Sequence, residues 1–169
     1  VGVGIKKDDV DAIEWASKEL DVYLAWSLHS SVPKHRSEIM PINDKYSIDS
    51  LIPKLKKYYD QTKLPIFIEW ICLEENMTDE HAKELIKIMK KVPSKLNLIE
   101  FNPLSNKDFK PASQEKIDKF SKTIQDSGFL VKVFYYKRAN FWNKTSIIFG
   151  GISASFYIYD ISWSFNKGA

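Results

Sequence analysis

The chain contains a single cysteine, Cys72, among its 169 residues. One thiol excludes an internal disulfide, and it excludes any metal site that needs several cysteine ligands from this chain. Cys72 lies within an apolar stretch that is typical of a strand. We therefore expect a small buried side chain there, with a reactive thiol as the alternative.

Arginine is almost as scarce, since only Arg36 and Arg138 occur among 25 basic residues and the net charge is +3. Composition therefore does not indicate nucleic-acid binding, and we expect the lysines on solvated helix faces rather than along a phosphate track. The sequence also has no phosphate-binding loop, no HExxH zinc motif and no dinucleotide-binding glycine pattern. These common signatures assign no function.

The sequence has no long apolar run. Its most apolar late stretch, residues 147–165, is interrupted by Gly150, Gly151 and Asp160, whereas a membrane-spanning helix needs about 20 largely apolar residues. No charged-then-apolar leader opens the chain, which starts without Met on VGVGI. The length is short for an eight-unit βα barrel of roughly 250 residues. We therefore expect a fragment of a larger domain that does not enter a membrane.

Three apolar stretches each end in polar residues and precede an amphipathic pattern; they are residues 22–29, 65–75 and 95–103. Such a run is typical of a buried parallel strand in a βα unit. Functional residues of repeated βα folds collect at the carboxyl ends of the strands. The polar residues near these ends are Ser27, His29, Glu69, Cys72, Glu74, Asn97 and Asn102. We therefore expect an α/β enzyme with a polar site at this edge of the sheet.

Capping residues and periodicity indicate the other elements. The expected helices are residues 8–20, 50–61 with Ser50 as N-cap, 79–91 with Thr78 as N-cap, and a helix that Ser113 opens and Gly128 stops. The further expected strands are residues 129–136 and, in an aromatic tail, 155–165. Residues 30–47 are expected to form a polar loop. His35 in this loop and His81 in a first helical turn are expected to face solvent.

The strand-end residues have more than one interpretation. Ser27 and His29 share one face of an extended strand, but no third orienting group is identifiable, which favours ligand contacts over a nucleophile–base pair. Glu69 is costly within an apolar strand, so an ion pair with a lysine and a ligand contact are both open. Asn97 and Asn102 either cap loops locally or contact a ligand.

Residues 24–51, LAWSLHSSVPKHRSEIMPINDKYSIDSL, resemble LAxSLHAxxxxxRxxxxPxNxxYxxxxL of the RlmN/Cfr family of radical S-adenosylmethionine RNA methyltransferases. The agreement continues in order. EWICLEENMTDEHAKEL is similar to EYxxLxGxNDxxxxAxxL, LNLIEFNP to VNLIPFNP, and FKPASQEKIDKFSKTIQDSGFLVKV to YxRPSxExIxxFxxxLxxxGxxVxV. The resemblance covers residues 22–133, and several motifs at matching spacing make it specific.

The resemblance implies an α/β fold of the radical-SAM type, a half-barrel of three to four parallel strands with helices. Residues 1–136 would form the carboxyl-terminal half of a (β/α)6 barrel, and residues 137–169 a divergent aromatic tail of unknown role. The family binds S-adenosylmethionine and a [4Fe–4S] cluster at the barrel mouth. The implied S-adenosylmethionine contacts are Ser27, Leu28 and His29 of the SLH motif and Asn102 of the FNP motif.

The sequence departs from the family pattern in two places. The cluster-binding CxxxCxxC motif is absent, so the cluster ligands lie outside this chain and we expect it to bind no iron when purified. Phe134, Tyr136 and Lys137 replace the residues of an RxSRG motif, and no later cysteine is present to carry the transferred methyl group. The chain is therefore expected to contribute no catalytic residue and no metal ligand.

The expected function is that of a fragment of a dual-specificity 23S rRNA and tRNA adenine-C2 methyltransferase, inactive alone. Two alternatives stay open: a non-catalytic relic that binds RNA or protein, and a radical-SAM enzyme of different chemistry. The partners expected for the complete enzyme are 23S rRNA and tRNA. A monomer in the cytoplasm or an organelle is the expected state, with no membrane partner.

Overall fold

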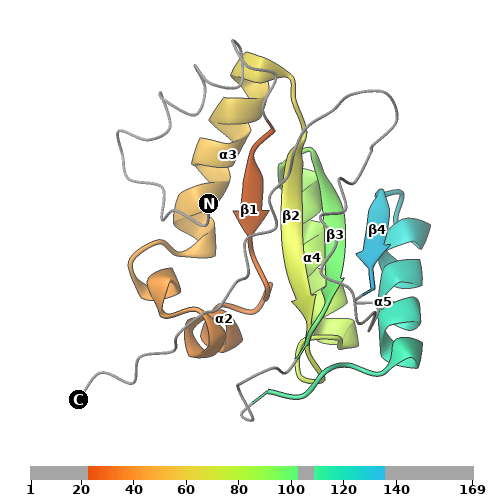
Figure 1. Cartoon of the computed structure of the whole chain (residues 1–169). Helices are drawn as coiled ribbons and strands as arrows, with labels where there is room; N and C mark the ends of the chain where they lie inside the picture. The colour runs from red at the N-terminus through yellow and green to blue at the C-terminus, as the bar shows by residue number, and fades with distance from the viewer. Residues whose placement is uncertain (1–22, 103–108, 136–169) are drawn as a thin grey trace, which may run out of the picture. The chain divides into compact units, whose positions relative to one another are not determined.

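The structure is a computed structural model that describes residues 23–102 and 109–135. The described strands are β1 (Ala25–Ser27), β2 (Ile66–Cys72), β3 (Ser94–Glu100) and β4 (Val131–Phe134). They form one sheet in the order β1-β2-β3-β4, and all three neighbouring pairs are parallel (Figure 1). The helix expected at 8–20, the tail 137–169 with its strand at 155–165, and the domain boundary after residue 136 lie outside the described residues.

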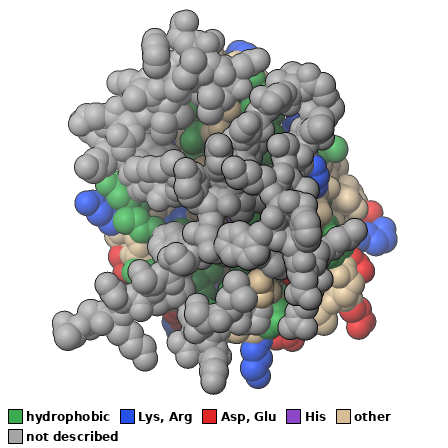
Figure 2. Space-filling model, viewed as in Figure 1, with side chains coloured by type: hydrophobic (Ala, Val, Ile, Leu, Met, Phe, Trp, Pro, Cys, Tyr) green, Lys and Arg blue, Asp and Glu red, His purple; other side chains and the backbone are tan. Residues whose placement is uncertain are grey.

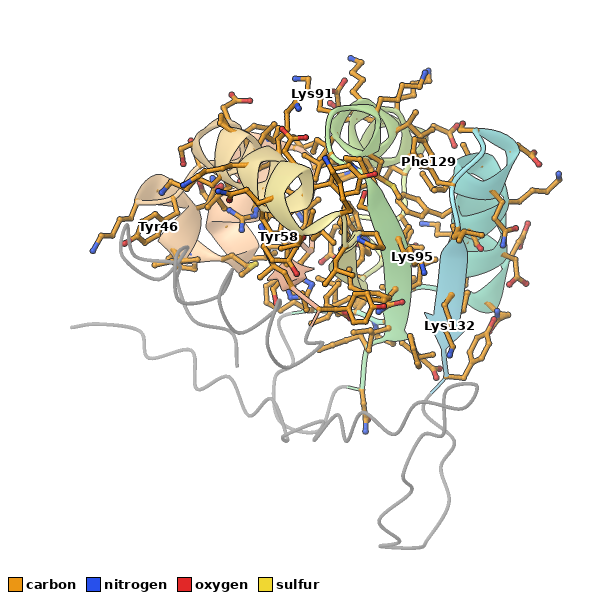
Figure 3. All side chains as sticks on the ribbon, turned by 90° about the horizontal axis from the view of Figure 1, so that it is seen from above. Tyr46, Tyr58, Lys91, Lys95, Phe129 and Lys132 are labelled. Carbon is orange, nitrogen blue, oxygen red and sulfur yellow. The ribbon has the colours of Figure 1, made fainter. Side chains whose placement is uncertain are left out.

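Helical segments connect each strand to the next. They are α2 (Pro33–Ile39), the 3-10 helix η1 (Pro41–Asp44), α3 (Ile48–Thr62), α4 (Asp79–Lys91) and α5 (Gln114–Asp126). Seen from above, α3, α4 and α5 gather on one side of the strands (Figure 3). Parallel strands linked by helices are the expected α/β architecture, and the expected half-barrel of three to four strands is confirmed.

The two faces of the sheet differ in burial. In β2, Ile66, Ile68 and Trp70 are completely buried, whereas Phe67 and Glu69 alternate with them and are half-buried. The buried set packs against the helices in one hydrophobic core. The largest fully buried core side chains are Trp70, Tyr58, Leu28, Leu55, Ile66, Ile68, Leu85, Met89, Leu96, Leu98, Ile117 and Ile124. We call the other face of the sheet, which carries Glu69, the inner face.

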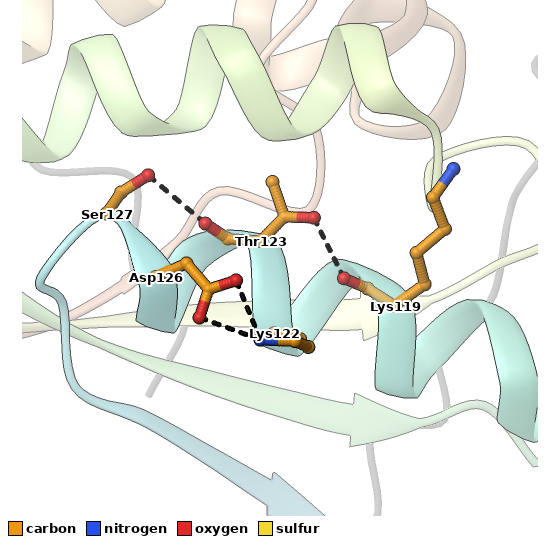
Figure 4. Close-up of polar contacts among 5 residues, drawn as sticks. All are labelled: Lys119, Lys122, Thr123, Asp126 and Ser127. Carbon is orange, nitrogen blue, oxygen red and sulfur yellow. Dashed lines mark hydrogen bonds and ion pairs between the residues drawn. The ribbon is translucent and has the colours of Figure 1, made fainter.

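Local signals account for α4 and α5. The Thr78 hydroxyl accepts a hydrogen bond from the His81 backbone N–H, and Ser113 caps α5 in the same way, both as predicted. Helix α5 ends just before Gly128, whose φ of +89° suits glycine best. The outer face of α5 carries an exposed ion pair of 2.8 Å between Lys122 and Asp126 (Figure 4).

Two predictions about the segment between β1 and α3 were wrong. Residues 30–47 are not one loop, because α2 and η1 form there with a proline at the start of each helix. Their buried side chains, Arg36, Ile39 and Asn43, hold them against the rest of the fold. Helix α3 begins at Ile48 with Ser47 as its N-cap, so the prediction of Ser50 as the cap was wrong.

The outer surface of the described residues carries charges of both signs. Lysine or arginine side chains and acidic side chains lie next to each other along the right of the view in Figure 2. Within residues 23–102 and 109–135, no helix is long and apolar enough to cross a membrane.

Candidate functional site

The chain leaves β1 through a turn of three residues, Ser27, Leu28 and His29, which we call the SLH turn. The backbone N–H groups of Leu28 and His29 both donate to the Glu69 carbonyl oxygen, at 3.1 and 3.3 Å. His29 has a φ of 55°, in the left-handed region. A side chain other than glycine costs about 1–3 kcal/mol there, and such strain clusters at functional sites.

The three side chains of the SLH turn point in different directions. Ser27 pairs in register with Glu69 and lies on the inner face. Leu28 is completely buried in the hydrophobic core, and its N–H and C=O groups are both hydrogen-bonded already. The Leu28 side chain therefore faces the core, and a contact between Leu28 and a cofactor stays a prediction.

Arg36 of α2 secures the SLH turn from one side. It is only 2% exposed. Its guanidinium donates to the carbonyl oxygens of Leu28 and Ser27, at 3.0 and 3.3 Å, and to Asn43 Oδ1 at 2.6 Å. Burial lowers the pKa of Arg36 to about 10, so the group stays charged at neutral pH. The charge strengthens these hydrogen bonds.

Asn76, which lies between β2 and α4, secures the turn from the other side and is completely buried. Its Nδ2 donates to the carbonyl oxygens of His29, at 2.8 Å, and Ile71, at 2.7 Å. Its Oδ1 accepts from the Leu73 N–H at 2.9 Å. Asn76 thus joins the carboxyl ends of β1 and β2.

The His29 imidazole is nearly buried, with 7% of the residue exposed. Its Nδ1 accepts a hydrogen bond of 3.1 Å from the Ile71 N–H. Burial, with the Arg36 charge as a second cause, lowers the pKa of His29 to about 4. The imidazole is therefore neutral at physiological pH.

A polar row crosses the inner face at the level of Ser27, the first residue of the SLH turn. Strand register aligns Ser27 with Glu69, Glu69 with Asn97, and Asn97 with Lys132. Asn97 Nδ2 donates to Glu69 Oε1 at 2.8 Å. Burial raises the pKa of Glu69, and the bond from Asn97 partly opposes that shift. Within the part of the chain that the structure describes, Glu69 forms no ion pair, which removes the structural support for the lysine interpretation.

The other predicted strand-end residues take distinct places. Asn102 follows β3 and is half-buried. Because β1 and β3 both run parallel to β2, Asn102 and His29 follow their strands at the same edge of the sheet. Cys72 is completely buried, and burial raises the pKa of its thiol to about 12, which confirms the buried interpretation over a reactive thiol. The described residues hold no group of three or more potential metal ligands.

Two histidines that were expected to face solvent are part of a hydrogen-bonded cluster instead. His81 is 6% exposed, and His35, half-buried, belongs to α2 rather than to a loop. His81 Nδ1 lies 2.8 Å from Thr78 Oγ1, and its Nε2 lies 3.3 Å from His35 Nδ1. Burial, and secondarily His35, lower the pKa of His81 to about 4. The solvent-facing prediction failed because His35 of α2 packs against His81 in the first turn of α4.

Arg36 and Asn76 were not among the predicted site residues. The available signal was indirect: Arg36 falls on the arginine of LAxSLHAxxxxxR, and Asn76 meets the asparagine of GxND once a gap of one residue is allowed. The contacts of both residues with the SLH turn become visible only in three dimensions.

No protein-family model matches the chain. The fold is similar to that of a radical SAM methyltransferase from Sphaerobacter thermophilus, with 28% sequence identity and a TM-score of 0.69 over 76% of this chain and 38% of that chain. A domain of pyruvate-formate lyase-activating enzyme from Bacteroides vulgatus ATCC 8482 is 12% identical, with a TM-score of 0.61 over 79% of this chain and 78% of that one. The latter likeness concerns the fold alone. Together with the parallel sheet, the likeness to the 28% identical structure supports a partial barrel of the radical SAM superfamily.

Proposed function

We propose that this chain is the carboxyl-terminal part of an RlmN/Cfr-like radical SAM RNA methyltransferase and that it binds S-adenosylmethionine at the carboxyl edge of its sheet. The observation that carries the proposal is the SLH turn. Its backbone is strained at His29, and two buried side chains, Arg36 and Asn76, are committed to holding it. Buried polar groups and strain concentrated at a strand end are typical of a ligand site.

The residues at this edge fit S-adenosylmethionine chemically. The ligand carries an amino group, a carboxylate, ribose hydroxyls and purine nitrogens, all of which form hydrogen bonds. The Ser27 hydroxyl, His29 Nε2 and the Asn102 amide have no hydrogen bond to any residue within 23–102 or 109–135. In the proposed complex, these groups would bind and orient the ligand.

An iron–sulfur cluster does not fit the residues of this chain. Cys72 is the single cysteine of the sequence, and it is buried in the core with a thiol pKa of about 12. A cluster needs several accessible thiolates. In the proposed enzyme the cluster ligands come from outside these 169 residues, and the chain's own contribution is to hold and orient S-adenosylmethionine, which supplies methyl and adenosyl groups when bound.

The proposal extends to the substrate and the setting of the complete enzyme. Adenine C2 of 23S rRNA and tRNA would be the methylated position, and the enzyme would act as a monomer in the cytoplasm or an organelle. The motif resemblance over residues 22–133 supports the RNA substrate, and the 28% identical structure supports a radical SAM methyltransferase in general. The chain spans 38% of that methyltransferase, so it would bind the cofactor without completing the reaction alone.

A second candidate is a non-catalytic relic that binds RNA or protein. It is favoured by one observation: Phe134, the last residue of β4, and the later residues Tyr136 and Lys137 replace the family's RxSRG residues, and no cysteine follows within these 169 residues. The methyl-carrying thiol is essential in the family mechanism that the resemblance implies. A relic keeps the sheet but has no need for the SLH turn to bind a ligand.

Isothermal titration of the 169-residue chain with S-adenosylhomocysteine, a stable analogue of the cofactor, separates the two candidates. We expect binding, and we expect His29→Ala and Asn102→Ala each to weaken it about tenfold, the loss of one hydrogen bond of roughly 1.4 kcal/mol. Lys90→Ala, an exposed change on α4, is the control that should leave affinity unchanged. Absence of binding, or equal affinity in all variants, would favour the relic.

A further inference from the structure

The hydrogen bond between β2 and the His29 ring determines where the imidazole carries its proton. A backbone N–H can only donate, so the Ile71 N–H requires a lone pair on His29 Nδ1. A neutral imidazole with a free lone pair on Nδ1 carries its hydrogen on Nε2. The ring therefore presents Nε2–H, a donor, to whatever lies against it.

The surroundings of His29 keep the ring neutral. The residue is 7% exposed, and the Arg36 guanidinium bonds the carbonyl oxygen of the preceding residue, Leu28. Burial and the nearby cation both disfavour a second proton, which lowers the pKa to about 4. Above that pH the ring neither gains a charge nor needs to change its tautomer.

Asn76 forms hydrogen bonds with the backbones of both residues that take part in this imidazole hydrogen bond. Its Oδ1 accepts a hydrogen bond from the Leu73 N–H, and its Nδ2 donates to the carbonyl oxygens of both His29 and Ile71. Each of these three bonds is between 2.7 and 2.9 Å. Because its amide is completely buried and already bonded at both ends, Asn76 has no role as a direct ligand contact. It acts on the two residues, His29 and Ile71, that share the imidazole hydrogen bond.

We infer that Asn76 is a positioning residue that locks His29 as a fixed hydrogen-bond donor through Nε2–H, so the ligand atom that meets His29 is an acceptor. The identity of the ligand as S-adenosylmethionine rests on the proposed function; the donor role of His29 does not. Hydroxyl and carboxylate oxygens and unprotonated purine nitrogens suit this donor. An ammonium or an exocyclic amino hydrogen does not.

Nitrogen NMR of histidine in the ligand-free chain tests the donor assignment without any ligand. With 15N-labelled histidine, we expect His29 Nδ1 to show the shift of an unprotonated, hydrogen-bonded nitrogen and Nε2 to show an attached proton, with no change between pH 8 and pH 6. A proton on Nδ1, or an averaged mixture of tautomers, would overturn the inference. This result is independent of S-adenosylhomocysteine binding, so the inference and the proposed function fail separately.

Two substitutions test the role of Asn76. Asn76→Ala removes all three bonds, and Asn76→Asp keeps the acceptor for Leu73 while losing both donations. In the folded variants we expect mixed His29 tautomers and at least tenfold weaker S-adenosylhomocysteine binding. Ile124→Ala, a core change of comparable cost in α5, should destabilise the chain but leave the His29 spectrum intact. An unchanged His29 spectrum in the Asn76 variants would show that Asn76 does not position the imidazole, and the inference about Asn76 would fail.

Analogue binding to the native sequence decides the ligand chemistry even if both Asn76 variants fail to fold. S-adenosylhomocysteine is compared with its 1-deaza, 3-deaza, 7-deaza and deoxyribose analogues and with its carboxyl ester, each of which lacks or blocks one acceptor. We expect one analogue to bind about tenfold more weakly than its parent, and to lose nothing further in His29→Ala. The panel also includes the analogue that lacks the adenine amino group, a hydrogen-bond donor; a His29-dependent loss that appears only with this analogue would contradict the acceptor assignment.

Discussion

Replacing Arg36 with methionine removes the buried cation that holds the end of β1 and keeps roughly the same apolar volume. The guanidinium donates to the oxygens of Leu28, Ser27, Asn43 and Tyr46 at 3.0, 3.3, 2.6 and 3.4 Å. Two of these bonds are short and charge-assisted, about 1.5–3 kcal/mol each, and the two longer ones contribute less. We expect a loss of about 3–5 kcal/mol in the free energy of unfolding, a large part of the roughly 5–15 kcal/mol of a typical domain.

Urea unfolding followed by tryptophan fluorescence, to which the buried Trp26 and Trp70 contribute, measures this loss. Arg36→Lys keeps the charge but cannot reproduce the fork of donors, so we expect it to lose more than half as much stability as the methionine variant. Lys34→Met, an exposed change on the same helix, should stay within about 0.5 kcal/mol of the parent. A loss below about 1 kcal/mol in Arg36→Met would refute the view that this cation secures the SLH turn.

Three further predictions concern stability and reactivity. The folded-state pKa values of His29 and His81, about 4, lie below the ordinary 6.5, so the unfolded chain binds more protons than the folded chain as the pH falls. Each histidine should therefore lower the free energy of unfolding by roughly 3 kcal/mol between pH 6.5 and pH 4, and the raised pKa of Glu69 opposes this loss. Urea titrations across that range measure the loss, and a stability that does not change with pH would contradict the shifts. The Cys72 thiol should react with a disulfide reagent only as fast as the chain unfolds, and rapid labelling in native buffer would show it to be accessible. Gly128→Ala should cost about 1 kcal/mol in thermal unfolding because of the +89° φ, although no atom lies within 4 Å of the added methyl group; an unchanged Tm would show that the turn relaxes.

Elements whose signals are local were predictable from the sequence. Thr78 and Ser113 cap α4 and α5 as expected, because a hydroxyl that accepts from the third residue onward needs no tertiary partner. Helix α2 was missed because PKHRSEI is short and polar and shows little periodicity. Arg36 stabilises it through oxygens on β1 and on the segment after η1, and no local pattern records those contacts.

In the candidate site, too, some features were predictable from the sequence and others were not. Strand ends and residue alternation predicted that Ser27, His29 and Asn102 would lie at one edge of a parallel sheet, which the strand order bears out. Asn76 was not predictable from its neighbours, because it meets His29 across 47 residues of sequence. The direction of the Leu28 side chain, into the core, also depends on the left-handed turn that follows it.

A titration of the 15N-labelled chain with S-adenosylhomocysteine, read residue by residue from its amide NMR spectrum, tests the central claim most directly. If the carboxyl edge of the sheet binds the cofactor, the largest shifts fall on the SLH turn, Asn76, Phe101 and Asn102, and the exposed faces of α4 and α5 stay unchanged. Shifts confined to those helices, or a spectrum that does not respond at millimolar ligand, would contradict the account.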